Sequence, residues 1–285
     1  MFIRRFFPTF LSLLICSAVL SYVSGIPQNA WAAKERGPSQ KEPAPEKEPP
    51  QTAEEAILRI SDNFSRILDF SASAQSRTVL NGEEVDVVEQ MRYLFQAPDK
   101  IRIETPSNQK TSQTGETILM VGSRIYAKDE TAGSVTEADM LEGQELGQGG
   151  FYGLHFWYYP ETFIENHLLS MLQVDQSRRM VTVRAEARSA NSIYSYLEFD
   201  IDYQKGLAYE TRIYDAWERR LVEKMTVLES AFLEPGVWFP MVVHKEPVFR
   251  SGENTLVTIM TFSRIQLNQG ISDTEFDPGV LAAAK

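Results

Sequence analysis

The sequence has little of the chemistry on which most enzymes and metal sites depend. Its 285 residues include one cysteine and three histidines. His155, His167 and His244 are scattered, and neither a His-Glu-x-x-His motif nor a cysteine pair is present, so the sequence predicts no metal site. The Gly-x-Ser-x-Gly elbow that presents the nucleophile of many serine hydrolases is also missing. We therefore predict no metal, no cofactor and no enzymatic activity, with a hydrolase as the weaker alternative.

Two local patterns resemble functional sites but have simpler explanations. The glycines within residues 147–153 look like a phosphate-binding loop, yet residues 137–145 before them are acidic and do not form the strand that such a loop follows. Asp200 and Asp202 share one face of a predicted strand, where they could bind a cation or act as an acid–base pair. Because the chain holds 39 acidic residues, a solvated face is the favoured interpretation.

An excess of positive charge is missing as well. The chain has 28 basic and 39 acidic residues, which gives a net charge of −11. An acidic protein is repelled by the phosphates of nucleic acids and by anionic lipid surfaces, so we expect no nucleic-acid partner. The acidity does not exclude apolar ligands.

The N-terminal residues have the three-part order of a secretory signal. Arg4 and Arg5 come before an uncharged, apolar run over residues 6–25, and the small-x-small sequence Ala30-Trp31-Ala32 follows. This order predicts a signal peptide over residues 1–32 and a periplasmic location for the rest of the chain.

Two alternatives to cleavage after Ala32 stay open: an uncleaved membrane anchor, and lipid attachment at Cys16. Lipid attachment is disfavoured because Ile15 stands where a lipoprotein signal has a small residue. Cleavage would remove two arginines, no acidic residue and the one cysteine, which leaves a net charge of −13. The mature protein would then be held together by its core and not by disulfides.

A linker and one domain follow. Residues 33–51 contain five prolines among Lys, Glu, Gln and Ser, which predicts a disordered Pro/Lys/Glu-rich linker. At Thr52 the composition changes, and Thr52 with Glu55 fits a helix capping box. Apolar residues then recur at helical spacing, so we predict an amphipathic helix over residues 53–68 at the start of a domain that spans 52–285.

After the helix, apolar residues recur at every second position. Residues 71–80 and 84–96 flank Asn81-Gly82, a dipeptide that supplies the positive φ angles of a tight hairpin. A helix is expected over 161–172, after an aromatic cluster at 151–159. Further strands are predicted at 101–104, 117–121, 125–128, 179–187, 193–203, 207–215, 219–229, 239–247 and 255–267.

Several of these strands carry apolar side chains on both faces, and such strands need cover on both sides. We therefore predict a mainly β (α+β) fold. It would be a strongly curved antiparallel sheet, or an incomplete β barrel, with helices covering the concave face.

Short motifs accompany this order of elements. They are the segments from Ala97 to Ile103, from Gly122 to Tyr126, from Trp238 to Pro240, and from Asn268 to Phe276. Together with the N-terminal helix and the first hairpin, they make the chain resemble the periplasmic outer-membrane lipoprotein carrier family and the wider group of outer-membrane lipoprotein-sorting proteins. The resemblance spans about residues 53–281.

The resemblance implies an incomplete barrel whose concave face is apolar, is covered by helices and can take acyl chains. Family members ferry lipoproteins across the periplasm or sense lipidated ligands. One position departs from the pattern: the carrier has an arginine just before the proline of the second strand, where this chain has Ala97. Handover of lipoproteins by the same switch is therefore not implied.

The candidate ligand-binding residues are apolar side chains that alternation places on one face, together with flexible thioethers that suit variable chains. They are Met91, Tyr93, Phe95, Ile101, Ile103, Met120, Phe156, Trp157, Met225 and Met241. The competing interpretation is that they are ordinary core. The predicted function is a periplasmic carrier whose partner is a lipid or a lipoprotein acyl chain. The alternative is an envelope sensor or scaffolding domain of the same fold that binds a protein partner.

Overall fold

The structure is a computed structural model, and the residues that it describes belong to one compact unit, Ala44–Lys285. The described residues are 46–107, 115–139, 159–190, 192–234, 236–248 and 255–283. The predicted signal peptide and the linker up to residue 45 lie outside them, as does the aromatic cluster up to residue 158. Those assignments stay predictions.

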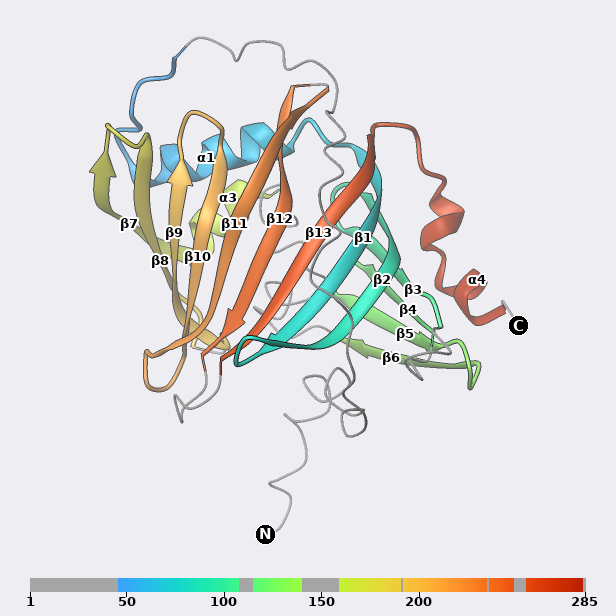
Figure 1. The fold of residues 1–285 in the computed structure, drawn as a ribbon. Helices are drawn as coiled ribbons and strands as arrows, with labels where there is room; N and C mark the ends of the chain where they lie inside the picture. Colours follow the sequence, from blue (N-terminus) through green and yellow to red (C-terminus); the bar gives the residue numbers. More distant parts are fainter. Residues whose placement is uncertain are drawn as a thin grey trace. The chain divides into compact units, whose positions relative to one another are not determined.

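One antiparallel sheet of 13 strands makes up most of this unit (Figure 1). Its order is β6-β5-β4-β3-β2-β1-β13-β12-β11-β10-β9-β8-β7, so hydrogen bonds between β1 and β13 join the start of the domain to its end. The strands are β1 Asp69–Leu80, β2 Glu83–Gln96, β3 Lys100–Thr105, β4 Glu116–Val121, β5 Arg124–Asp129, β6 Ser134–Asp139, β7 His167–Asp175, β8 Met180–Ala187, β9 Tyr194–Asp202, β10 Leu207–Asp215, β11 Leu221–Leu233, β12 Val237–Pro247 and β13 Leu256–Leu267.

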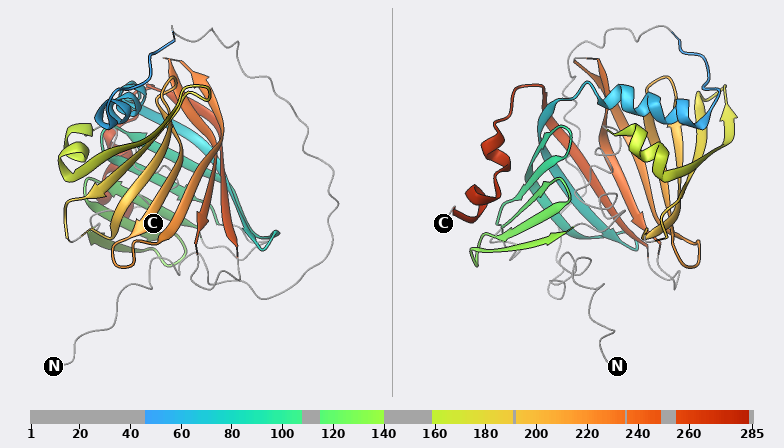
Figure 2. Two further views of the ribbon diagram at one scale, coloured as in Figure 1. Left: turned by 90° about the vertical axis from the view of Figure 1, so that its left-hand side faces the viewer. Right: turned by 180° about the vertical axis from the view of Figure 1, so that it is seen from behind.

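The sheet is strongly curved (Figure 2). It is also open, since β6 and β7 are two edges that do not pair with each other. This confirms the predicted mainly β class with a curved antiparallel sheet. The predicted first hairpin is confirmed as well: Asn81 and Gly82 have φ angles of 52° and 87°, and Leu80 pairs with Glu83. Both turn residues need positive φ, which Asn and Gly adopt at little cost.

The prediction of one helix over residues 161–172 is wrong in its second half. Helix α3 spans Pro160–Asn166, and the chain continues directly into β7. Pairing decides the outcome, because β7 is hydrogen-bonded along its length to β8, for example at Leu169↔Ala185. Tertiary hydrogen bonding here overrides a local apolar pattern that fits either structure. Strand β6, in the acidic segment, was not predicted.

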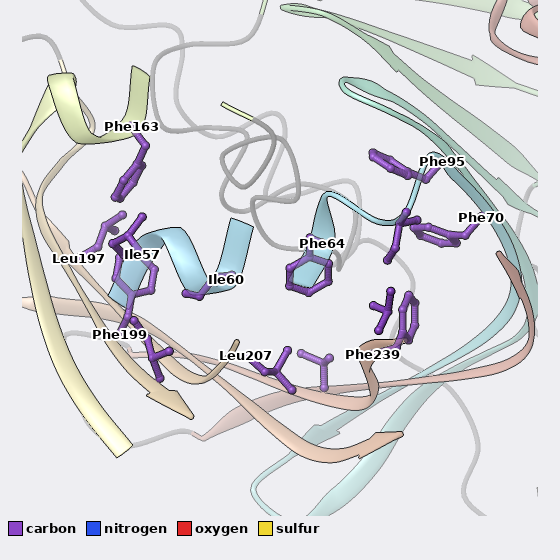
Figure 3. Close-up of a cluster of buried hydrophobic side chains, with 14 of the residues drawn as sticks. Ile57, Ile60, Phe64, Phe70, Phe95, Phe163, Leu197, Phe199, Leu207 and Phe239 are labelled. Carbon is purple, nitrogen blue, oxygen red and sulfur yellow. The ribbon is translucent and has the colours of Figure 1, made fainter. Parts of the chain in front are cut away.

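Helix α1, Ala53–Phe64, lies on the concave face of the sheet, and Thr52 caps it by accepting a hydrogen bond from the Glu55 amide (Figure 3). Ile57 and Ile60 are fully buried in the main core, which lines the concave face. On the other face, the C-terminal helix η2, Asp273–Phe276, lies beside β3 and β4, and α4, Pro278–Ala283, lies beside β5 and β6. Phe276 and Leu281 pack there in one cluster with Leu94 and Leu119. The predicted helical cover of the concave face is thereby confirmed, and the C-terminal helices add cover on the other face beside β3 to β6.

The last residues of the predicted disordered linker contact the domain. The backbone of Lys47 exchanges two hydrogen bonds with the side chain of Gln204, and the carbonyl of Glu48 accepts one from Arg59. Pro50 is buried. Residues 46–51 therefore lie against α1 and the turn between β9 and β10, whereas the linker as a whole stays a prediction.

Among the described residues, no helix combines the length and the apolar character that a membrane span requires.

Candidate functional site

The concave face of β1 to β5 brings the predicted apolar residues together. Register places Phe95 opposite Ile101, and Ile101 opposite Met120, so these three side chains form a row across β2, β3 and β4. In the next row Tyr93 lies opposite Ile103. The expectation that the two sets share one face is confirmed, because directly opposite residues in an antiparallel sheet point to the same side.

Aromatic packing holds the centre of this face. Tyr93 and Phe95 have no exposed surface. The Phe70 ring stacks on both of them, with centroids 5.8 Å and 5.4 Å away, and the Phe262 ring meets Tyr93 edge-on at 5.7 Å. Such contacts are those of a close-packed core. Tyr93 and Phe95 can therefore contact a ligand only if the elements that bury them move away from this face.

The remaining candidates extend the same surface. Met91, Ile103, Met120 and Met225 are buried, whereas Ile101 and Met241 are partly buried beside the main core. Eight candidates thus lie on the concave face, and the structure does not test whether they bind a ligand. Phe156 and Trp157 lie outside the described residues.

Helix α1 covers only part of this surface. It packs on α3 and on β7, β8, β10 and β12, so it lies over the half of the sheet that ends at β7 (Figures 2 and 3). Phe199 and Leu207 face it from β9 and β10. The candidate rows on β2, β3 and β4 lie beyond that half.

Polar contacts at one edge of the concave face fix the position of α1. The Asn63 side-chain amide donates to the Trp238 carbonyl and accepts from the Trp238 amide, both at 2.8 Å. Nearby, Gly206 in the turn between β9 and β10 has a φ of +63°, and a Cβ added there would collide with the Arg59 carbonyl of the helix. These contacts hold one side of α1 against the turn between β9 and β10 and against the start of β12.

One ion pair on the concave face was not anticipated from the sequence. Glu223 and Lys245 are in phase with Met225 and Val243, which face the core, and the Lys245 Nζ lies 3.0 Å from the Glu223 Oε2. Burial raises the pKa of the Glu223 carboxyl, and the nearby Lys245 charge opposes this effect only in part. The sequence did contain a signal for this pair: in each of the two strands, a charged residue occupies a position where the alternation predicts an apolar, inward-facing side chain.

The outer face of β8 to β10 carries a separate polar network. Arg212 pairs with Glu198 at 3.0 Å and with Asp200 at 2.8 Å, and Thr182 donates to Asp200. Burial would raise the pKa of Asp200, but hydrogen bonds from Arg212 and Thr182 lower it below its ordinary value. Asp202 accepts from the amides of the following turn. These contacts give both aspartates structural roles on a partly buried face.

His167 is buried and satisfied, since its ring nitrogens contact the Phe163 carbonyl at 2.7 Å and the Tyr194 hydroxyl at 2.8 Å. Within the described part of the chain, no group of three or more His, Cys, Asp or Glu side chains is arranged to hold a metal ion.

Solved structures share this arrangement. A DUF1329 family protein from Desulfovibrio piger superposes with a TM-score of 0.61 at 13% identity, covering 80% of this chain and 98% of its own. A LolA superfamily protein from Nitrosomonas europaea gives a TM-score of 0.58 at 14% identity, covering 81% of this chain and 100% of its own. The chain has a LolA-like fold.

An outer membrane lipoprotein-sorting protein domain from Vibrio parahaemolyticus agrees, with a TM-score of 0.59, 14% identity, and coverage of 81% of this chain and 99% of its own. No protein-family model and no curated protein sequence matches the chain. At identities this low the likeness is one of fold. The LolA-like fold confirms the resemblance seen in the order of elements.

Proposed function

We propose that this LolA-like protein is a periplasmic carrier that binds the acyl chains of a lipid or a lipoprotein on its concave face. The proposal rests on one observation: apolar residues cover that face beyond the area on which α1 packs. Phe95, Ile101 and Met120 continue the apolar surface across β2, β3 and β4. Acyl chains are recognised by such surfaces through burial of apolar area, about 25 cal/mol per Å².

Entry of a chain requires the cover to move, because most of these side chains are buried. Helix α1 covers the neighbouring half of the same apolar face, so its displacement would let an acyl chain reach the rows on β2, β3 and β4 from that side. It is amphipathic, lies near the start of the domain, buries Ile57 and Ile60 in the main core, and meets β12 through one hydrogen bond that Asn63 donates and one that it accepts. A lid that shifts by breaking a few such bonds is an ordinary way for a closed pocket to open.

The N-terminal sequence supports the location. A signal peptide over residues 1–32 would deliver the protein to the periplasm, and residues 33–45 would act as a spacer.

Binding of a fluorescent fatty-acyl probe tests the proposal. Ile101 is partly buried on the concave face, so Ile101→Asn should leave the domain folded and weaken probe binding about tenfold by adding a polar group to the acyl path. The matched control is Leu172→Asn on the edge strand β7, where the side chain is 46% exposed. Equal affinities for wild type and Ile101→Asn, measured by fluorescence titration, would argue against binding on this face.

A second function, binding of a protein partner, is favoured by the edge strand β7. Strand β6 at the opposite edge carries Glu137 and Asp139, charges that discourage pairing with another strand. Strand β7 instead exposes Leu168 and Leu172, with 53% and 46% of their surface accessible. A stoichiometric protein that co-purifies with the wild type, and is lost on charging Leu172, would favour this function.

A further inference from the structure

A buried carboxyl group interrupts the apolar concave face. Glu223 on β11 lies opposite Ile213 on β10, and Ile213 lies opposite the core residue Leu197 on β9. The Glu223 side chain therefore points to the same side as the core, and only 17% of its surface is exposed. A carboxylate at such a position loses much of its hydration.

The two carboxylate oxygens of Glu223 differ in their partners. The Oε2 atom pairs with the Lys245 Nζ at 3.0 Å. The Oε1 atom is buried and, within the described part of the chain, accepts no hydrogen bond. A buried acceptor without a donor is destabilising, so the fold keeps an unfavourable group at this point. Burial accordingly raises the pKa of the Glu223 carboxyl above its ordinary range.

The surroundings combine apolar and polar groups. Lys245 lies opposite Met225 on one side and opposite Thr258 on the other, and Thr258 lies opposite the buried Thr78. A short polar strip thus crosses β11, β12, β13 and β1 beside the apolar part of this face. An acyl chain with a small polar head group has the same division between apolar and polar parts.

We infer that Glu223 anchors the head group of an acyl ligand by accepting a hydrogen bond at Oε1 from a neutral donor. The inference rests on the proposed function. A neutral donor fits better than a cation, because Lys245 already balances the carboxylate charge. The donor is a hydroxyl or an amide N–H next to the acyl chain, as in a monoacylglycerol or at an N-acylated amine.

Two pairs of palmitoyl probes, each with one member that carries a hydrogen-bond donor and one that does not, test the inference. N-Methylpalmitamide has an N–H that N,N-dimethylpalmitamide lacks, and monopalmitoylglycerol has hydroxyls that methyl palmitate lacks. By displacement of a fluorescent acyl probe, the wild type should prefer the donor-bearing member of at least one pair about tenfold, as one hydrogen bond to a charged acceptor predicts. The pair that shows the preference identifies the source of the donor.

Variants separate an anchor from a structural ion pair. Glu223→Met should abolish the preference while keeping affinity for the donor-free probes, and Glu223→Gln, which retains an acceptor, should restore part of it. If circular dichroism shows that Glu223→Met is poorly folded, the double variant Glu223→Met with Lys245→Met is used in its place. The double variant leaves no unpaired ammonium group on this face.

The outcomes distinguish the two proposals. A wild type that binds neither member of either pair contradicts the proposed function itself. A wild type that binds both members of each pair equally, with the variants unchanged, contradicts only the anchor.

Discussion

Tyr93→Arg is expected to unfold the domain at room temperature or to lower its free energy of unfolding by about 4 kcal/mol or more. Tyr93 has no exposed surface, and its ring lies between Phe70 and Phe262. The guanidinium would be buried among aromatic rings that cannot replace its hydration, and the loss of the Tyr93 ring would leave the aromatic cluster incomplete. Thermal melts followed by circular dichroism measure the effect.

Ser263→Arg is the matched control. Ser263 follows Phe262 on β13, is exposed, and points to the outer face, so the same side chain should change stability by about 0.5 kcal/mol or less. If Tyr93→Arg instead melts like the wild type, Tyr93 lines a hydrated hollow, and the packing account of this face is wrong.

Gly206→Ala is expected to cost about 3 kcal/mol or more, because two penalties coincide. Its φ of +63° disfavours a side chain, and the new Cβ would collide with the Arg59 carbonyl and lie 3.1 Å from the Asn63 Cβ. Both neighbours belong to α1, so the turn or the helix must shift. Urea unfolding measures the loss.

Gly133→Ala carries the first of these penalties alone, the backbone cost of a side chain at positive φ. Gly133 has nearly the same φ, +65°, and nothing lies within 4 Å of a Cβ built there. Its substitution should therefore cost only the backbone term, about 1 kcal/mol. Equal losses for the two variants would show that α1 does not press on the turn between β9 and β10.

Local signals in the sequence predicted the parts of the fold that depend on neighbouring residues. Asn81-Gly82 predicted a hairpin, and alternation in 84–96 and 101–104 predicted which side chains share a face. The helix predicted for residues 167–172 was wrong because the spacing of their apolar residues suits a helix and a strand equally. Hydrogen bonding to β8 makes them a strand. That pairing depends on residues distant in the sequence.

The candidate site was predictable to a similar extent. The apolar residues on β2 and β3 were found, because alternation is a local pattern. Glu223 was missed because its inward direction and its ion pair depend on Ile213 and Lys245. Only the pairing of the strands brings these two residues beside it. The docking of Lys47 on Gln204 was missed for the same reason, since 157 residues separate the two.

Photoaffinity labelling with a diazirine derivative of palmitic acid tests the central claim most directly. After irradiation and proteolysis, mass spectrometry locates the adducts on the chain. The account predicts adducts in peptides that contain Met91–Ile103 and Met120, competed by unlabelled palmitic acid and reduced in Ile101→Asn. Adducts confined to exposed apolar residues such as Leu172 and Trp217, with the concave strands unlabelled, would contradict binding on the concave face.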